Sequence, residues 1–258
     1  MKKIAILMLS LLPFQQISFA KNFTLVTPGA FTIAHDDSFA PFGYAEKDAT
    51  GKYGPSQGFE IDLLKKVVSK MGLKTIFKPD AWAKVLVSVK VGDADAIATI
   101  GINEERKKSY DYTNPYASYA SSLFVVKNST IKGLNDLKGK KIGIQKNHFS
   151  VPWIREHYPE VEQITFENAN DAFLAVLSGK VNGAVADKLV GLFTMKENNE
   201  LKGKLKSVGK EFAMTPVALA FAKGKDRKLI KAFNLSLKKL QNTTELSSIY
   251  KKWFGIEK

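Results

Sequence analysis

The chain has 258 residues, no cysteine and a formal net charge of +14 at pH 7. The lack of cysteine excludes disulfide bonds and a lipid-anchored form, and it argues against a structural zinc site. The charge raises nucleic acid as a partner, but the lysines are interleaved with acids, as in Lys65-Lys66 after Glu60 and Asp62. We therefore expect a solvated basic surface and no nucleic-acid partner.

The first twenty residues have the pattern of an export signal. Lys2 and Lys3 precede an apolar run over 4–14, and small residues follow up to Ala20. The run is far shorter than the roughly 20 residues that a membrane span needs, which disfavours an anchor. We predict a secretory signal peptide over 1–20, cleaved after Ala20, and a periplasmic mature protein.

From residue 21 onward, short apolar segments alternate with amphipathic ones, which indicates α/β layering. Apolar residues at helical spacing predict a helix over 60–71 that ends at Gly72, and a second over 83–91 that ends at Gly92. The expected strands of this first part are residues 25–26, 31–33, 75–77 and 96–100. Helices and strands of similar length recur in the second half.

The second half repeats one unit of the first. A helix over 171–177 precedes Gly179 and a strand over 184–186, and residues 92–99 follow the same plan. In both units a polar residue stands where the strand ends, which makes Thr99 and Asp187 counterparts in two related lobes. Because ligands of open α/β sheets lie beyond the carboxyl ends of strands, we expect both at one cleft. The C-terminal part has two apolar stripes typical of core-facing helices, the second ended by Gly255.

A search for catalytic chemistry is negative. His35, His148 and His157 lack the spacing of metal ligands, and the chain has no phosphate-binding loop or nucleophile elbow. We expect no catalytic residue, no metal and no cofactor.

Arg106 breaks a local charge rule. Asn103 is a good N-cap, so Glu104, Glu105 and Arg106 fall in the first turn of a helix, where acids are favoured and a cation is not. Either the arginine is solvated or paired with a neighbouring glutamate, or it binds an anion. The residues alone leave both alternatives open.

Longer motifs resemble a known family. The run Gly58-Phe59-Glu60-Ile61-Asp62-Leu63, followed by Val67-Val68 and Met71, matches the signature of the family 3 extracellular solute-binding proteins, which bind polar amino acids. The similarity extends in order through Ala40-Pro41-Phe42, Glu105-Arg106-Lys107, Tyr112-Thr113-Asn114-Pro115-Tyr116, Leu137-Lys138-Gly139-Lys140-Lys141-Ile142-Gly143 and Ile249-Tyr250-Lys251-Lys252-Trp253-Phe254-Gly255.

The resemblance implies an α/β fold of the periplasmic binding protein-like type II class, with two lobes of mixed sheets joined by a two-crossover hinge. The first lobe would comprise 21–117 and 214–258, and the second 118–213, with crossovers near Ser118-Tyr119 and Ala213-Met214. The implied function is a monomeric receptor that captures an amino acid between the lobes. It would deliver this ligand to the membrane permease of an ATP-driven importer.

The resemblance also implies roles for individual residues. Arg106 would bind the α-carboxylate of the ligand, helped by the strand end at Ala98 and Thr99, and Asp187 would bind the α-ammonium from the opposite lobe. Such a pair of holders suits a zwitterion, since each buried charge is matched. Only a closed state satisfies both holders, so binding is expected to drive closure of the lobes.

The side chain of the ligand would lie between Phe39 and Trp82. The position of Asp36 can contact polar or cationic groups, and Asp36 with Asp37 gives a slight preference for a cationic amino acid.

Two positions depart from the family pattern. Gly101 stands where a serine or threonine hydroxyl usually contacts the carboxylate, and Asn147-His148-Phe149 replaces a Gly-Thr-Thr turn. We expect Gly101, Asn147, His148 and Phe149 to contact the ligand in a reshaped pocket. Ser150 is expected to cap the following helix, with Pro152 in its first turn.

Two other functions use the same scaffold. One is an exported enzyme similar to the cyclohexadienyl and arogenate dehydratases, in which His148 would be the general acid. Retention of both Arg106 and Asp187 favours simple binding over this reaction. The other is a solute-sensing signalling module, which would share the pocket.

Overall fold

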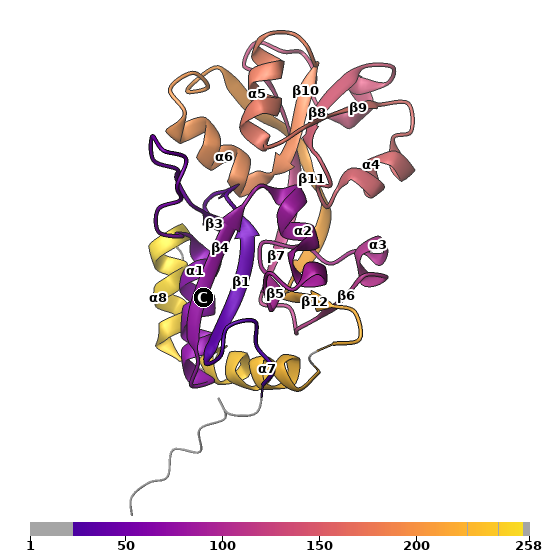
Figure 1. The fold of residues 1–258 in the computed structure, drawn as a ribbon. Helices are drawn as coiled ribbons and strands as arrows, with labels where there is room; N and C mark the ends of the chain where they lie inside the picture. The colour runs from indigo at the N-terminus through magenta and orange to yellow at the C-terminus, as the bar shows by residue number, and fades with distance from the viewer. Residues whose placement is uncertain (1–22, 226, 242, 255–258) are drawn as a thin grey trace, which may run out of the picture.

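The structure of the protein is a computed structural model that describes residues 23–225, 227–241 and 243–254. The predicted signal peptide and its cleavage point after Ala20 lie outside these residues. Within the described ranges, none of the helices has both the length and the apolar character needed to cross a bilayer. Two α/β lobes lie one above the other, with long strands running between them (Figure 1).

The first lobe is built on a mixed sheet with the strand order β4-β1-β5-β12-β6. Its central strand β1 runs parallel to β4 and β5, whereas β12 is antiparallel to β5 and β6. The strands are β1 (Ala30–Asp36), β4 (Lys74–Asp80), β5 (Ala96–Ile97), β6 (Tyr110–Tyr112) and β12 (Ala220–Ala222). A separate hairpin joins β2 (Ser38–Phe39) to β3 (Gly43–Tyr44), and the helices are α1 (Phe59–Lys70), α2 (Trp82–Val91), α3 (Glu104–Lys107), α7 (Arg227–Gln241) and α8 (Thr244–Phe254).

The second lobe is built on a sheet with the order β11-β7-β10-β8-β9. Strands β8, β9 and β10 are mutually parallel, and β7 is antiparallel to both of its neighbours. The strands are β7 (Ala117–Val126), β8 (Lys141–Gln145), β9 (Glu162–Phe166), β10 (Gly183–Asp187) and β11 (Leu205–Val217), and the helices are η2 (Leu134–Leu137), α4 (Val151–His157), α5 (Ala169–Leu177) and α6 (Lys188–Glu197).

Two strands carry the chain between the lobes. The chain leaves the first sheet after β6 and enters the second through β7, and it returns through β11 to β12. Near the crossing, Tyr119 pairs with Thr215 and Ala117 with Val217, and the pairing shifts register on either side of Phe212. The two crossover strands therefore support each other where the lobes meet.

Most predicted elements are confirmed to within a residue or two. The helices expected over 60–71, 83–91 and 171–177 are α1, α2 and α5. Gly58 precedes α1 with a φ of 133°, and a Cβ there would lie 2.2 Å from the carbonyl oxygen of Phe42, so only glycine fits. The apolar stripe of α7 is buried as expected, whereas Gly255, the predicted end of the last helix, lies outside the described residues.

Two predicted strands are wrong, because one is absent and the other is shorter than expected. Residues 25–26 form no strand, because the Val26 N–H donates to Asp95 Oδ1 at 2.8 Å instead of joining a ladder. The strand expected over 96–100 ends at Ile97, since Thr99 has a φ of 56° and cannot continue the pleat.

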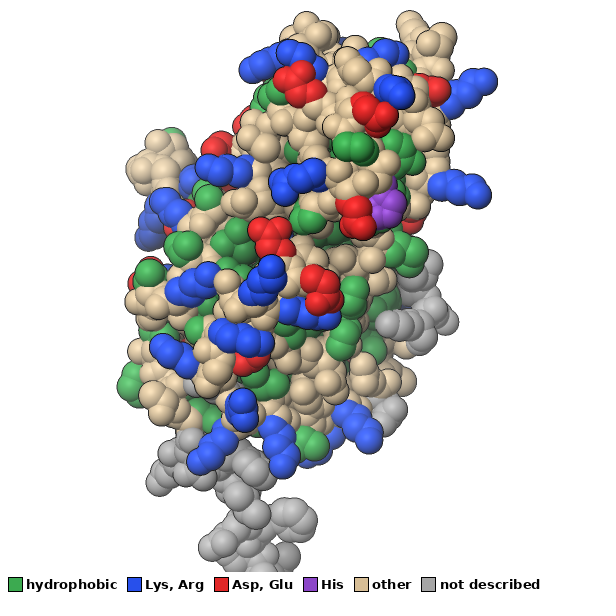
Figure 2. All heavy atoms as spheres, turned by 90° about the vertical axis from the view of Figure 1, so that its right-hand side faces the viewer, with side chains coloured by type: hydrophobic (Ala, Val, Ile, Leu, Met, Phe, Trp, Pro, Cys, Tyr) green, Lys and Arg blue, Asp and Glu red, His purple; other side chains and the backbone are tan. Residues whose placement is uncertain are grey.

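Basic side chains are dispersed over the surface that carries α3 and α4. Figure 2 shows lysine and arginine side chains on this face scattered among acidic and hydrophobic ones, without a continuous stripe.

Candidate functional site

Arg106 lies at the junction of the two lobes. The Asn103 side chain caps α3 by accepting from the Arg106 N–H at 2.8 Å, as predicted. The guanidinium donates from Nη1 to the Gly101 carbonyl oxygen at 2.8 Å and from Nη2 to the Asn147 carbonyl oxygen at 2.7 Å. Among the described residues it forms no salt bridge, so the glutamate pairing considered from the sequence is not what the structure contains. Burial desolvates the guanidinium and so lowers the pKa of Arg106, but the side chain stays protonated at neutral pH.

Trp82 and Asn147 complete this contact between the lobes. Trp82 begins α2, and its Nε1 donates to the Asn147 carbonyl oxygen at 3.3 Å. Its ring lies 5.3 Å from Arg106 Cζ, within cation–π distance. Asn147 follows β8 with a φ of 60°, a left-handed conformation that asparagine tolerates. One carbonyl of the second lobe thus accepts from two side chains of the first.

Asp187 is a buried carboxylate at the end of β10. Its side chain is 2% exposed and caps α6, because Oδ1 accepts from the N–H groups of Leu189 at 2.8 Å and Val190 at 3.1 Å. The other oxygen, Oδ2, accepts from the Ala120 N–H of β7 at 3.1 Å. Burial raises the pKa of Asp187 to about 7, against the opposing effect of these three hydrogen bonds. No cation forms a salt bridge with it in the described part of the chain.

Tyr119 links the surroundings of the two charged groups. The positive charge of Arg106 and the negative charge of Asp187 both act on its hydroxyl. Its ring centroid lies 5.1 Å from that of Phe39 and 5.7 Å from that of Phe149. Both predicted anchors therefore lie near enough to this buried tyrosine to interact with it electrostatically, and the sequence indicated Tyr119 only as a crossover residue.

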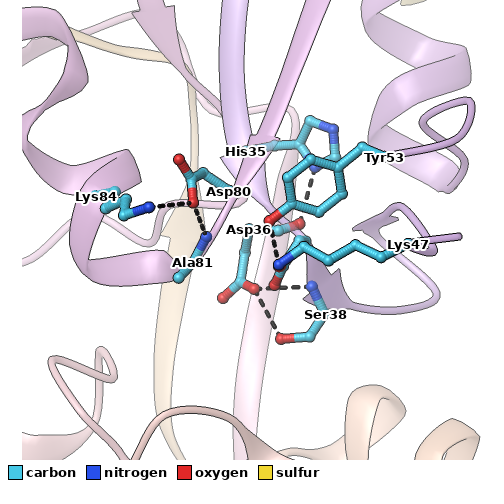
Figure 3. Close-up of polar contacts among 9 residues, drawn as sticks. His35, Asp36, Ser38, Lys47, Tyr53, Asp80, Ala81 and Lys84 are labelled. Carbon is cyan, nitrogen blue, oxygen red and sulfur yellow. Dashed lines mark hydrogen bonds and ion pairs between the residues drawn. The ribbon is translucent and has the colours of Figure 1, made fainter. Parts of the chain in front are cut away.

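Asp36 ends β1 and already contacts the second lobe. Oδ1 accepts from the N–H and the hydroxyl of Ser38, both at 2.9 Å, and Oδ2 accepts from Gln145 Nε2 at 2.9 Å. Figure 3 shows the Asp36 carboxylate turned towards Ser38 and away from Asp80. Burial raises the pKa of Asp36 to about 6. Gln145 is a contact that the sequence analysis missed.

Asp37, the neighbouring acid, contacts only side chains of its own lobe in the interactions described here. Its Oδ2 accepts from the hydroxyl of Tyr53 at 2.7 Å and lies 3.6 Å from Lys47 Nζ. The slight preference for cationic ligands inferred from two neighbouring acids thus depends on Asp36 alone.

Glu60 holds Thr99 and the start of β7 together. This carboxylate is fully buried and accepts from the Thr99 N–H at 3.0 Å, from the Tyr116 hydroxyl at 2.6 Å and from the Tyr119 hydroxyl. Burial raises the pKa of Glu60, and these hydrogen bonds oppose the shift. Thr99 Oγ1 in turn accepts from the Asp36 N–H at 3.0 Å, next to the buried Ala98. From the sequence, Glu60 is notable only as part of the family motif over residues 58–63.

Gly101 and Phe149 fit each other across the junction. A Cβ at Gly101 would lie 2.2 Å from Thr215 Cγ2 and 3.4 Å from Phe149 Cβ. Phe149 belongs to the second lobe, yet its ring packs into the main hydrophobic cluster of the first, together with Tyr119 and Phe39. The missing hydroxyl at Gly101 is thus explained by a lack of space.

The two predicted aromatic walls lie in different clusters. Phe39 packs against Phe42 and Tyr119, whereas Trp82 packs with Val85 and Val89 beside Arg106. Ser150 precedes α4 without capping it, because its hydroxyl bonds to His148 Nδ1 at 2.8 Å; Pro152 does lie in the first turn. No group of residues suited to a metal ion occurs among those described.

Two cavities adjoin the junction of the lobes. One of about 520 Å³ lies between α2 and α3 on one side and α4 on the other, and Arg106, Asn147 and His148 line it. The other, of about 920 Å³, is lined by Phe42, Phe193 and Trp253 among others, and by none of the predicted ligand contacts.

Comparison with known proteins identifies the relatives of this chain. The family model described as "Bacterial extracellular solute-binding proteins, family 3" matches residues 31–256. The ABC transporter glutamine-binding protein GlnH of Bacillus subtilis is 36% identical over 205 residues, 78% of this chain and 73% of that protein. The L-cystine-binding protein TcyJ of Escherichia coli K12 is 27% identical over 232 residues, 89% of this chain and 84% of that protein.

A solved structure shares the fold. An ancestral arginine-binding protein bound to glutamine has a TM-score of 0.78 and 34% sequence identity, and the match covers 89% of this chain and all of that one.

Proposed function

The chain belongs to family 3 of the bacterial extracellular solute-binding proteins, and from that premise we propose that it is a periplasmic receptor for an amino acid. It captures the ligand between its lobes and delivers it to the permease of an ATP-driven importer. In this proposal the signal peptide is removed after Ala20 and the mature protein is a monomer.

One observation carries the proposal. A guanidinium from the first lobe, Arg106, and a buried carboxylate from the second, Asp187, both act on Tyr119 and are paired with no opposite charge among the described residues. A zwitterion supplies the two missing partners, a carboxylate for Arg106 and an ammonium group for Asp187. The same pair suits no purely apolar or purely cationic solute.

The proposed hinge lies where β7 and β11 pass from one lobe to the other. Residues 21–117 with 214–258 would move as one lobe and 118–213 as the other. In the present arrangement the lobes touch through Arg106–Asn147 and Asp36–Gln145 hydrogen bonds, at 2.7 and 2.9 Å. Entry of a ligand requires these contacts to open, and closure around it re-forms a junction that includes the ligand.

The ligand is a polar amino acid in this proposal. Asp36 remains mostly ionised at neutral pH with a pKa of about 6, so it could pair with a cationic side chain if Gln145 gives way. The related proteins that bind glutamine, cystine and arginine show how varied such ligands are within the family.

Binding without catalysis is part of the proposal. A dehydratase would need a general acid, and His148 does not suit that role, because burial lowers its pKa to about 3 and its ring carries no acidic proton at neutral pH. Asp187, whose pKa is raised to about 7, is in this proposal the partner of the ligand ammonium group.

A thermal-shift screen of the twenty amino acids, followed by calorimetry, tests the receptor function. We expect one or a few amino acids to raise the melting temperature and to bind with micromolar affinity, about −8 kcal/mol. Turnover of prephenate or arogenate by the purified protein, with no stabilisation by any amino acid, would support the dehydratase instead.

A further inference from the structure

The exposed face of α7 is strongly basic. The 15 residues of this helix include five cations and no acid. The side chains of Leu229, Phe233 and Leu240 are buried on the opposite side of the helix. None of the five cations forms a salt bridge with another described residue. All five are exposed, so the fold leaves their charge unneutralised: Arg227, Lys228, Lys231, Lys238 and Lys239.

The helix lies at the end of the first lobe that is remote from the second lobe (Figure 1). Basic side chains also gather along the same end of the molecule in Figure 2. Phe233 and Leu237 belong to the main hydrophobic cluster of the first lobe, which fixes the helix and keeps its basic face turned outwards. A partner bound to this face leaves the space between the lobes free.

One apolar side chain lies among these cations. Leu235 is 57% exposed, and its neighbours at helical spacing are Lys231, Lys238 and Lys239. A single exposed leucine is ordinary on a protein surface. A leucine surrounded by lysines has a more specific meaning, because the headgroup region of a lipid bilayer accepts both an apolar side chain and the cations around it. The composition of this face therefore fits a membrane surface.

A hollow of about 640 Å³ runs along the basic face of α7. Three of the five cations line one wall, and Asn114 with the end of β6 contributes to the other. Asp111 is the one acid among the described residues of the lining, and it already accepts from Lys223 Nζ at 2.8 Å and from the Gly224 N–H at 2.7 Å. The hollow thus offers space beside three cations in which an anionic headgroup can lie.

We propose that the exposed face of α7 binds the surface of a membrane that contains anionic phospholipids. The charges are complementary, since such a surface has a negative potential that attracts clusters of lysine and arginine. Nucleic acid is a poorer match, because the exposed positions of α7 carry no aromatic ring on which a base could stack. Binding holds the exported protein near the membrane and raises its local concentration there. The inference does not depend on the ligand of the cleft.

Vesicle co-sedimentation tests the proposal with the protein that lacks only the predicted signal peptide. Vesicles of phosphatidylcholine alone are compared with vesicles that also contain about one third phosphatidylglycerol. We expect binding to the anionic vesicles only, and its loss when the salt concentration is raised to about 0.5 M, because screening shortens the range of the attraction. Equal binding to both kinds of vesicle, or no binding to the anionic ones at low salt, would overturn the proposal.

A set of four substitutions distinguishes the basic face from the net charge of the protein. Glutamine, which is nearly as good a helix former as lysine, would replace four residues together: Lys228, Lys231, Lys238 and Lys239. We expect the apparent affinity for anionic vesicles to fall at least about tenfold.

The matched control removes the same charge from exposed lysines of the second lobe that form no salt bridge with a described residue: Lys127, Lys140, Lys202 and Lys210. It should change the vesicle affinity less than about twofold. An equal fall in both variants would show that the net charge alone is responsible and that the proposal is wrong.

Leu235→Gln tests the apolar contact with all cations retained. We expect it to weaken vesicle binding at least about threefold, and an unchanged vesicle affinity would contradict the membrane contact. Preference for a DNA duplex over anionic vesicles would also reject the membrane as the partner. Both the leucine variant and the four-lysine variant should keep the wild-type affinity for the amino acid in calorimetry. If the wild type binds no amino acid, the receptor function fails, while the vesicle assay still decides this inference.

Discussion

Arg106 Nη2 donates to the carbonyl oxygen of Asn147 at 2.7 Å, so a cation of the first lobe is bound directly to the backbone of the second. The bond orients the guanidinium while its charge stays unneutralised by any acid among the described residues. A carbonyl compensates part of the desolvation of an arginine, but not its net charge. In the proposed receptor, opening of the lobes breaks this bond and frees the guanidinium for the ligand carboxylate.

Removing the guanidinium tests the first anchor. We expect Arg106→Ala to weaken binding of the amino acid by roughly 2–5 kcal/mol, because the ligand carboxylate would lose its charged partner. Isothermal titration calorimetry measures the change. Arg227→Ala is the control, since Arg227 is an exposed arginine of α7, and its affinity should equal that of the wild type.

Asp187→Asn tests the second anchor. An asparagine oxygen can still cap α6, but its amide nitrogen cannot accept from the Ala120 N–H as Oδ2 does, so the fold should form with some loss of stability while the charge that holds the ammonium group is lost. We expect binding weaker by roughly 2–5 kcal/mol and a melting temperature lowered only by the loss of this one hydrogen bond. Affinity close to that of the wild type would remove Asp187 from the site.

The pKa of Asp187 gives the binding a pH dependence. With a pKa raised to about 7, roughly half of the free protein carries a neutral Asp187 at neutral pH, while an ammonium ligand binds the ionised form. Affinity should therefore fall as the pH decreases below 7, by up to about tenfold per pH unit. Calorimetry with the amino acid that the screen identifies, in buffers of different ionisation enthalpy, should detect proton release on binding. The release should vanish in Asp187→Asn and persist in Asp36→Asn.

Gly101→Ser would introduce the hydroxyl that usually contacts the ligand carboxylate in this family, but the new side chain would clash with Thr215. The added Cβ would lie 2.2 Å from Thr215 Cγ2, so we expect weaker binding and a lower melting temperature. Thr215→Ser removes that methyl and keeps the hydroxyl that donates to the Ile102 carbonyl oxygen at 3.2 Å. The double variant should recover most of the loss in a double-mutant cycle. Purely additive effects would show that Thr215 does not impose the glycine.

Glu60 should matter for stability more than a surface acid. Glu60→Ala leaves two tyrosine hydroxyls and the Thr99 N–H without their acceptor, and we expect a loss of about 2–5 kcal/mol in urea unfolding. Glu60→Gln should be milder, because its amide can accept from Thr99 and donate to a tyrosine hydroxyl. Glu245→Gln, which removes partly exposed ion pairs with Lys66 and Lys70, should change little.

Local patterns sufficed for the helices but not for the contacts between lobes. Apolar spacing and a terminal glycine located α1 and α2, and the Asn103 cap followed from residue type alone. Local patterns singled out Arg106 and Asp187, and the resemblance supplied their roles. By contrast, the hydrogen bond from Gln145 to Asp36 joins residues 109 positions apart, and the spacing of apolar residues along the sequence cannot predict such a contact. Nothing in the sequence marks Glu60 as buried, because an acid in the first turn of a helix is ordinarily solvated, whereas here Tyr116 and Tyr119 cover it.

A crystal structure of the protein with the amino acid identified by the screen tests the account most directly. We predict that the ligand carboxylate bonds to Arg106 and the ligand ammonium group to Asp187, with the lobes closed over both. A ligand bound outside the space between the lobes, or one that leaves either of these side chains untouched, would contradict the account.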